Sequence, residues 1–142
     1  YREDERELIP ICQEQNVALT PYSPLAAGRL SRLEWKTDTL RSRTDKTAAG
    51  KYDAMLEADY GIVLRVHETA EKYGVTMTQI ALAWQWARGV AVPLVGATKV
   101  QYFNDAVGAL DVTLTAEDMA YLEELYIPHK IVGALSPEQA NR

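Results

Sequence analysis

The stretch 17–30 holds the residues of this sequence that are best suited to bind a ligand. Its first part, 17–19, is an apolar run typical of a short strand. The next part, 20–24, must be extended or turning, because its two prolines lack amide donors and push the residue before each of them away from helix. The small residues at 26–28 would let a ligand approach the backbone closely. An aromatic ring, a hydroxyl, small residues and then arginines predict one wall of a binding cleft; an ordinary strand-to-loop connection is the alternative.

A second candidate site lies where the apolar run 90–95 ends in Gly96 and leads through Thr98 and Lys99 towards a helix. A run that is apolar throughout is typical of a strand covered on both faces of a parallel sheet. Thr98 is the expected N-cap of the helix, with Gln101 at its third position. Small residues before a helix N-terminus can bind an anion, because free backbone amides and the helix dipole favour negative charge there. A plain capped helix is the competing interpretation.

The segment 31–57 shows no clean periodicity and is rich in arginine, including Arg32 and Arg41. A loop of this length inside a compact domain is usually a lid or binding loop, or else disordered. Arginine pairs with phosphate oxygens in a bidentate manner, so this loop could hold phosphates; a solvated surface is the plainer explanation. Trp35 and Tyr52 could be lid aromatics or peripheral packing residues.

Helical periodicity and capping signals indicate the elements that must position these loops. Helices are expected at 4–15, 59–73, 76–88, 98–110 and 114–125, with strands at 17–19 and 90–95. Gly74 is a candidate left-handed C-cap, Thr76 and Gln79 form a capping box, and Thr115 caps the last helix. Pro10 is expected to bend the first helix. The expected buried stripe of the fourth helix consists of Val100, Phe103, Val107 and Leu110.

Composition limits the class of protein. The chain has 142 residues and a net charge of −5, which is one domain or part of one and disfavours nucleic acid or an anionic membrane as the main partner. Its single cysteine, Cys12, lies among apolar residues and is expected to be a buried, inert thiol. With no signal peptide and no long apolar span, a cytoplasmic location is the default expectation. His67 is interpreted as a residue of the helix surface, and no metal site is predicted.

Three motifs carry a family resemblance. The run 22–30, Tyr-Ser-Pro-Leu-Ala-Ala-Gly-Arg-Leu, resembles the loop after the seventh strand of an aldo-keto reductase. The run 92–98, Val-Pro-Leu-Val-Gly-Ala-Thr, resembles the eighth strand of those enzymes and its loop. The run 126–129 and the pair 132–133 resemble the tail of one bacterial branch. The resemblance implies an α/β fold, namely the C-terminal portion of a (β/α)8 TIM barrel over 1–142, with a cofactor or lid loop at 31–57 and a C-terminal tail at 126–142.

The resemblance also implies the cofactor, NADP, and a division of roles among the loop residues. Tyr22 would stack on the nicotinamide ring. The pyrophosphate would be lined by Ser23, Leu25, Ala26 and Gly28, with Arg32 and Arg41 nearby. The adenosine phosphate would be surrounded by Gly96, Thr98, Lys99 and Tyr102, with Asp105 reaching the adenine. Two positions depart from the family pattern, since Tyr102 or Gln101 stands where many members have Gln or Arg, and Ala106 stands where Asn is frequent.

The family reduces aldehydes and ketones with a tetrad of Asp, Tyr, Lys and His from the first half of the barrel, and this sequence contains none of the segments that carry them. We therefore expect this chain to supply cofactor binding but to be inactive by itself, and to pair with the missing N-terminal half or to self-associate, because two parallel strands cannot close a barrel. Two other classes remain open. One is a nucleotide-binding regulatory module, as in family members that serve as subunits of membrane channels; the other is a non-enzymatic fragment that oligomerises.

Overall fold

The structure is a computed structural model that describes residues 2–34, 52 and 55–128. Most of the predicted lid loop at 31–57, including Arg41 and Trp35, lies outside the described residues, as does the predicted tail beyond residue 128. The described elements, in chain order, are η1 (Glu3–Glu5), α1 (Leu8–Glu14), η2 (Ala26–Gly28), α4 (Leu56–Tyr73), α5 (Met77–Ala87), α6 (Val100–Gly108), η4 (Ala109–Asp111) and α7 (Ala116–Glu123). In the described ranges, no helix is long and apolar enough to cross a membrane.

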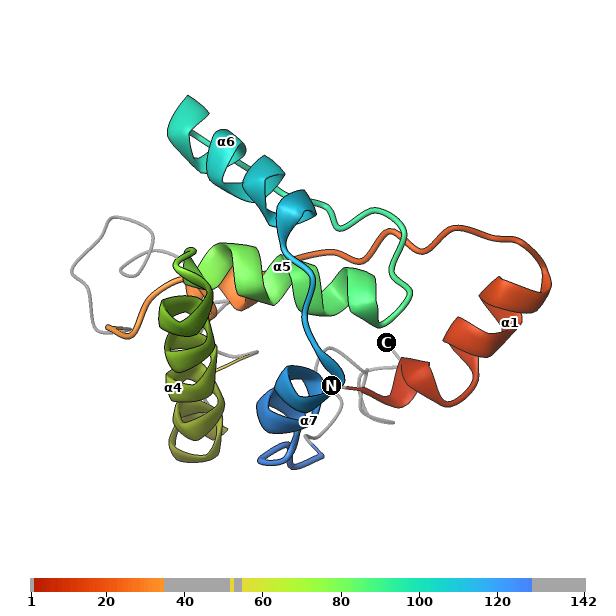
Figure 1. Cartoon of the computed structure of the whole chain (residues 1–142). Helices are drawn as coiled ribbons and strands as arrows, with labels where there is room; N and C mark the ends of the chain where they lie inside the picture. Colours follow the sequence, from red (N-terminus) through yellow and green to blue (C-terminus); the bar gives the residue numbers. More distant parts are fainter. Residues whose placement is uncertain (1, 35–51, 53–54, 129–142) are drawn as a thin grey trace, which may run out of the picture.

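Helix α5 is the centre of the fold, and α4, α6 and α7 lie around it (Figure 1). Ile80 and Leu82 of α5 are completely buried. Ile80 belongs to a cluster with Val63 and Val66 of α4 and Leu122 of α7, while Leu82 packs with residues that follow α6 and with those of α6 itself. The central helix therefore has two buried sides, and it joins the α4–α7 pair to the α6 region.

The predicted caps of α4, α5 and α7 are confirmed, whereas α4 begins at Leu56, three residues before its predicted start at Asp59. Thr76 Oγ1 accepts a hydrogen bond from the Gln79 amide, and the Gln79 side chain accepts one from the Thr76 amide, which completes the capping box. Thr115 and Asp118 make the corresponding box at the start of α7. Gly74 ends α4 with φ 65°, a left-handed conformation that glycine adopts without steric cost. These local hydrogen bonds satisfy backbone groups that a helix terminus leaves unpaired.

The predicted helix at 4–15 is wrong at its start. The chain forms the short helix η1, turns, and begins α1 only at Leu8. Pro10 is thus the third residue of α1 and does not bend a longer helix. In the first turn its missing N–H costs no hydrogen bond, because the first four amides of any helix have no partner within it. Cys12 is buried and unpaired, as expected.

The two predicted strands are not formed as strands within the described ranges. They are reduced to one parallel bridge between Tyr22 and Leu94. Two hydrogen bonds of 3.1 Å flank it, from the Val92 amide to Leu19 O and from the Leu94 amide to Pro21 O. Proline at 21 and 93 cannot donate, which limits the ladder, and neither segment has a second described strand beside it. Val92 and Leu94 are 54% and 55% exposed, so the expectation of a strand covered on both faces is also wrong for this chain.

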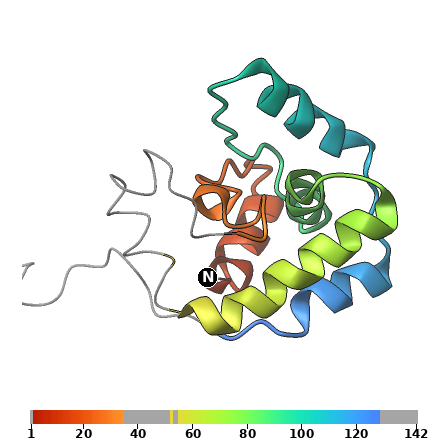
Figure 2. The ribbon, with the colours of Figure 1, turned by 90° about the vertical axis from the view of Figure 1, so that its left-hand side faces the viewer.

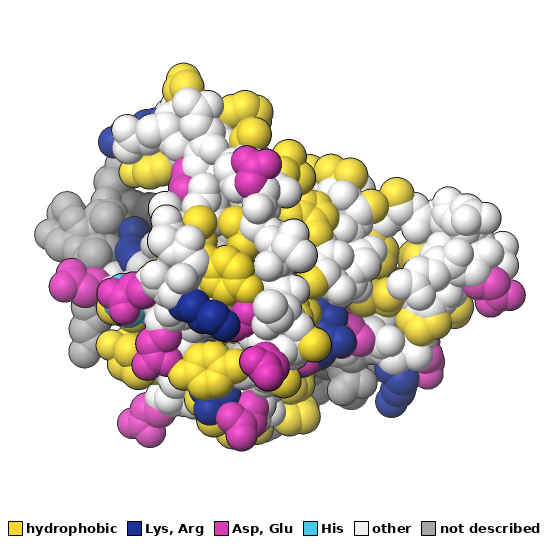
Figure 3. Space-filling model, in the orientation of Figure 1, with side chains coloured by type: hydrophobic (Ala, Val, Ile, Leu, Met, Phe, Trp, Pro, Cys, Tyr) yellow, Lys and Arg dark blue, Asp and Glu magenta, His cyan; other side chains and the backbone are white. Residues whose placement is uncertain are grey.

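Helix α6 corrects two further expectations. Lys99, with no side-chain cap, precedes the helix where Thr98 was expected to cap it. The stripe predicted to be buried is open to solvent: Val100, Phe103, Val107 and Leu110 are 75%, 59%, 46% and 66% exposed. The helix packs instead through small side chains, Ala106 of α6 and Ala109 just after it, against Leu82. Nothing in the described part of the chain covers this stripe of larger apolar side chains. Figure 3 shows hydrophobic surface in the region of α6.

Candidate nucleotide-binding site

The parallel bridge brings the two candidate loops together. Tyr22 pairs with Leu94, and Gly96 follows two residues later, so both loops leave the bridge at the same end. The sequence-based expectation that these two segments are parallel neighbours is confirmed. Tyr22 is 77% exposed, and its ring is therefore accessible for stacking on a planar ligand. The ligand-binding roles of the residues remain predictions.

The first loop has a tightly wound backbone with several residues in left-handed conformations. Ser23, Ala26 and Ala27 have φ values of 57°, 48° and 55°, and Gly28 has 91°. Such conformations cost a non-glycine residue on the order of 1 kcal/mol or more each, and they persist only where the surroundings impose them. The loop's own amides impose part of this shape, with Ala26 N donating to Ser23 O at 3.0 Å and Gly28 N donating to Leu25 O at 2.8 Å.

Helix α5 holds the first loop in place through a hydrogen bond and apolar contacts. Gln85, which is buried, donates a hydrogen bond of 2.8 Å from Nε2 to the carbonyl oxygen of Pro24. Leu25 packs against the Leu82 cluster, and Leu30 and Leu33 pack against the Ile80 cluster. The loop is therefore anchored at both ends to the buried core around α5. A polar loop shaped by a rigid element is the usual construction of a binding site.

The Ser23 hydroxyl is held by two groups. Its Oγ accepts from the Ala27 amide at 3.3 Å and from the Tyr52 hydroxyl at 3.2 Å. The Tyr52 ring in turn lies under the guanidinium group of Arg29, with 5.0 Å between Cζ and the ring centroid. The sequence leaves Tyr52 open as a lid aromatic or a peripheral packing residue; in the structure its hydroxyl contacts the first loop at Ser23.

Arg32 lies close to Gly28, and its role at a pyrophosphate stays a prediction. A Cβ added at Gly28 would lie 3.6 Å from Nη2 of Arg32, so the guanidinium group folds back close to the glycine backbone. The Arg32 side chain is exposed. Arg41 lies outside the described residues, and its predicted role stays a prediction.

The second loop, residues 96–99, has an uncovered backbone at Gly96 and an exposed cationic side chain at Lys99. Gly96 has no atom within 4 Å of the position that a Cβ would take. Thr98, Lys99 and Tyr102 are exposed, and Lys99 Nζ lies 5.7 Å from the centroid of the Tyr102 ring. This cation beside open backbone at the start of α6 suits an anion, because the helix dipole favours negative charge there.

Asp105 has a partner inside the chain. Its Oδ1 accepts a hydrogen bond of 2.7 Å from Thr76 Oγ1, and Gln79 Nε2 donates to its carbonyl oxygen at 3.1 Å. The capping box of α5 is thus tied to α6. This architectural contact was not visible in the sequence, because nothing in the spacing of residues 76 and 105 reveals it.

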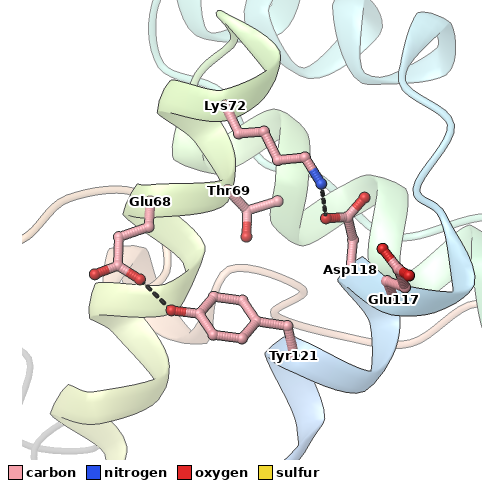
Figure 4. Close-up of a pocket in the computed structure, with 6 residues that line it drawn as sticks. All are labelled: Glu68, Thr69, Lys72, Glu117, Asp118 and Tyr121. Atoms are coloured by element: carbon pink, nitrogen blue, oxygen red, sulfur yellow. Dashed lines mark hydrogen bonds and ion pairs between the residues drawn. The ribbon is translucent and has the colours of Figure 1, made fainter.

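A hollow in the described surface lies elsewhere. It has a volume of about 400 Å³ and lies between α4 and α7, which run side by side in Figure 2 and are enlarged in Figure 4. The side chains that line it are Glu68, Thr69, Lys72, Glu117, Asp118 and Tyr121. None of the predicted nucleotide-binding residues is among them. The described ranges also hold no group of three acidic, histidine or cysteine residues that could bind a metal.

Four of the six side chains that line this hollow form two pairs, Lys72 with Asp118 and Tyr121 with Glu68. Asp118 accepts from Lys72 Nζ at 2.6 Å, from Tyr73 Oη at 2.5 Å and from Thr115 Oγ1 at 2.7 Å. Burial by itself raises the pKa of the Asp118 carboxyl, but the hydrogen bonds from Lys72, Tyr73 and Thr115 outweigh it and hold the pKa well below its usual range. Across the hollow, the Tyr121 hydroxyl donates to Glu68. We interpret this cluster as the connection between α4 and α7 and not as a catalytic centre.

Comparison with known proteins now identifies the family. The family model described as "Aldo/keto reductase family" matches residues 1–127. A Schizosaccharomyces pombe protein provisionally named aryl-alcohol dehydrogenase is 44% identical over 137 residues, covering 95% of this chain and 38% of that protein. The versiconal hemiacetal acetate reductase of Aspergillus parasiticus is 40% identical over 131 residues, covering 92% of this chain and 38% of that reductase. The chain therefore spans less than half the length of these curated relatives.

Solved structures agree with the sequence relatives. The thermostable aldo-keto reductase Tm1743, crystallised with the inhibitor epalrestat, matches with a TM-score of 0.60 at 27% identity, over 89% of this chain and 36% of that chain. The glycerol dehydrogenase AKR11B4 of Gluconobacter oxydans matches with a TM-score of 0.71 at 22% identity, over 96% of this chain and 43% of that chain, and so shares the fold. The chain belongs to the aldo/keto reductase family.

Proposed function

We propose that this chain is the nucleotide-binding portion of an NADPH-dependent oxidoreductase that reduces aldehydes or ketones to alcohols, and that it corresponds to the C-terminal part of a (β/α)8 barrel. The observation that carries the proposal is the Tyr22–Leu94 bridge, which makes two loops of different chemistry start side by side. In (β/α)8 barrels, the loops after the last two strands commonly hold phosphate. A cytoplasmic location accompanies the proposal, because such a reductase needs the NADPH pool of the cell interior.

The residues present fit a nicotinamide dinucleotide. Tyr22 has an exposed ring for the nicotinamide. Ser23 and Gly28 lie on a wound loop with Arg32 folded over it, which suits a pyrophosphate. Lys99 follows the open backbone of Gly96 by three residues at the start of α6, which suits the 2′-phosphate of the adenosine. When bound, the cofactor would supply the hydride; the chain's own groups bind it, orient it and neutralise its phosphates.

The first test removes the positive charge of Lys99 and asks whether the chain loses affinity for NADPH in particular. We expect the chain to bind NADPH, and Lys99→Met to weaken that binding by about tenfold, the effect of one charge-assisted hydrogen bond of roughly 1.5 kcal/mol. NADH lacks the 2′-phosphate and serves as the internal control. Its affinity for Lys99→Met should stay within about twofold of its affinity for the parent chain. Fluorescence titration of the reduced nicotinamide measures both. A parent chain that binds neither nucleotide would contradict the proposal.

We further propose that the exposed apolar surface is completed by the rest of the barrel, on the same polypeptide or a second one. Leu94, which forms the bridge, and Val92 just before it are each more than half exposed, as are Val100 and Phe103 of the apolar stripe on α6. Exposed apolar residues that gather into a patch mark an interaction site or an aggregation hazard. A pair of extended segments also leaves unpaired backbone edges that favour pairing with further chain.

The second test concerns this apolar surface. The chain by itself should self-associate as its concentration rises, and Phe103→Asp should shift it towards monomer, because a carboxylate on the surface opposes burial there. Its effect on the free energy of unfolding of the monomer should stay within about 0.5 kcal/mol, since the Phe103 ring is already exposed. Ile127→Asp is the matched control at an exposed apolar residue after α7 and should leave association unchanged. Sedimentation velocity measures the effect; equal association of both variants and the parent would contradict this assignment.

A further inference from the structure

The pairing of Ser23 with Tyr52 joins the nucleotide loop to a residue 29 positions later in the chain. The Tyr52 hydroxyl donates to Ser23 Oγ at 3.2 Å, and the contact is partly buried. Neither the alternation of arginines nor the loop motif indicates it. Among the described residues, Tyr52 is the only part of the segment 35–54 that the structure places, and what it contacts is the loop assigned to the pyrophosphate.

A count of donors and acceptors at Ser23 gives this contact a chemical consequence. A serine hydroxyl has one proton to donate and two lone pairs that accept. Both lone pairs are occupied, one by the Ala27 amide at 3.3 Å and the other by the Tyr52 hydroxyl. The Ser23 proton is therefore the group that remains to meet an incoming ligand. A hydroxyl restricted to donation suits an anionic oxygen and disfavours a ligand donor such as an amide N–H.

Tyr52 also acts through its ring. The guanidinium group of Arg29 lies over it, with 5.0 Å from Cζ to the ring centroid, and Arg29 Nη1 is 3.5 Å from Ala26 O. A cation over an aromatic face is held by the ring quadrupole. One tyrosine thus fixes both a hydroxyl donor and a cation along the same loop. The two groups match the needs of a diphosphate, whose oxygens accept hydrogen bonds and carry negative charge.

We propose that Tyr52 is a positioning residue for the diphosphate of a bound dinucleotide: it holds the Ser23 hydroxyl as a donor and the Arg29 guanidinium beside it. This inference rests on the proposed function and deepens it, because it assigns to a residue of the segment 31–57 a defined role at the same site. Tyr52 itself is not expected to touch the reacting atoms.

The test compares variants that remove the hydroxyl, the ring or the partner. Tyr52→Phe keeps the ring and should weaken NADPH binding about fivefold; Tyr52→Leu also removes the ring and should weaken it about twentyfold, in the range of one and two modest polar interactions. Ser23→Ala should weaken binding about tenfold for the same reason. In the double variant of Ser23→Ala with Tyr52→Phe, the loss should equal that of Ser23→Ala, because the Tyr52 hydroxyl then has nothing to position.

A second ligand separates positioning from a merely structural effect. Adenosine 2′-monophosphate carries the adenosine phosphate but no diphosphate, so its affinity should be unchanged in Tyr52→Phe. Tyr121→Phe removes a tyrosine hydroxyl in the α4–α7 hollow and is the matched control, with NADPH affinity unchanged. Calorimetric titration with each ligand and a melting curve of each apo variant supply the readouts.

The outcomes distinguish this inference from the function on which it rests. If the parent binds no NADPH, both are overturned. If Ser23→Ala weakens binding but Tyr52→Phe does not, the positioning role is overturned and the proposed function stands. The positioning role is overturned in the same way if Tyr52→Phe weakens the binding of NADPH and of adenosine 2′-monophosphate equally, since that pattern reports a general distortion of the fold.

Discussion

Replacement of Asp118 by alanine is expected to lower the free energy of unfolding by about 3 kcal/mol, the scale of losing a buried, hydrogen-bonded charge together with a helix cap. The residue is 4% exposed. Its carboxylate accepts from Lys72 and Tyr73 on α4 and from Thr115 at the start of α7. Alanine would leave the Tyr73 hydroxyl without this acceptor, abolish the capping box of α7 and separate the two helices that enclose the hollow of Figure 4.

Urea denaturation measures this effect, and two variants control it. Asp118→Asn retains one acceptor oxygen and nearly the same volume, and it should therefore lose less stability than alanine. Glu117→Ala removes the neighbouring acidic side chain, which is exposed and lines the same hollow, and should change the free energy of unfolding by no more than about 0.5 kcal/mol. Equal effects of Asp118→Ala and Glu117→Ala would show that the cluster does not connect the helices.

The same cluster sets a pH dependence with a definite sign. The pKa of Asp118 is lower in the folded chain than in the unfolded chain, so its stabilisation is complete above the unfolded pKa of about 4 and is lost as the pH falls through the folded value. Hydrogen bonding to Asp118 raises the pKa of Lys72 and that of Tyr73. Their stabilisation is complete below the unfolded values near 10 and is lost as the pH rises through the folded ones. The melting temperature of Asp118→Asn should therefore change less with pH than that of the parent, at both acidic and alkaline pH.

The parts of the fold that sequence reasoning predicted correctly are those written in short-range signals. Thr76 with Gln79, the cap Thr115, and Gly74 each act within one helical turn, so the residues themselves determine where α4, α5 and α7 begin or end. The pairing of the two loop-bearing segments was also predictable, because an apolar run leading into small residues occurs at both, and parallel neighbours follow from the family resemblance.

The errors come from contacts between distant residues. Periodicity on α6 identifies an apolar stripe, but which face is buried depends on what lies against it, and here Ala106 meets α5 while Phe103 meets solvent. The extended segments depend in the same way on neighbours, and the described residues place no further strand beside them. Tyr52 and Asp105 make their defining hydrogen bonds to residues 29 positions away, and no local pattern encodes such a partner. The candidate site was therefore predictable as two loops but not as the contacts that hold them.

The chain by itself is expected to bind NADPH and yet to reduce no carbonyl compound. Hydride transfer to a carbonyl carbon needs a proton for the oxygen, and an oriented general acid contributes about 10²–10⁴-fold to the rate, with precise placement of substrate contributing more. By family resemblance, the acid and the residues that orient it come from segments outside this sequence. His67, the one histidine among the described residues, lies on α4 with Nε2 3.5 Å from Glu71 Oε1, not at the loop pair.

An assay with NADPH and an aromatic aldehyde, followed by the absorbance of the reduced nicotinamide, should give a rate equal to that of buffer. Ser23→Ala makes the result decisive, because activity from a contaminating reductase is indifferent to a substitution in this chain, whereas activity of the chain must fall with its affinity for the cofactor. Turnover that co-elutes with the chain and falls in Ser23→Ala would overturn the expectation and would require a proton donor within these 142 residues. Turnover that the substitution leaves unchanged belongs to another protein. Among the described residues nothing covers the apolar face of α6 or the bridged segments, so we expect hydride transfer to require further polypeptide that covers them.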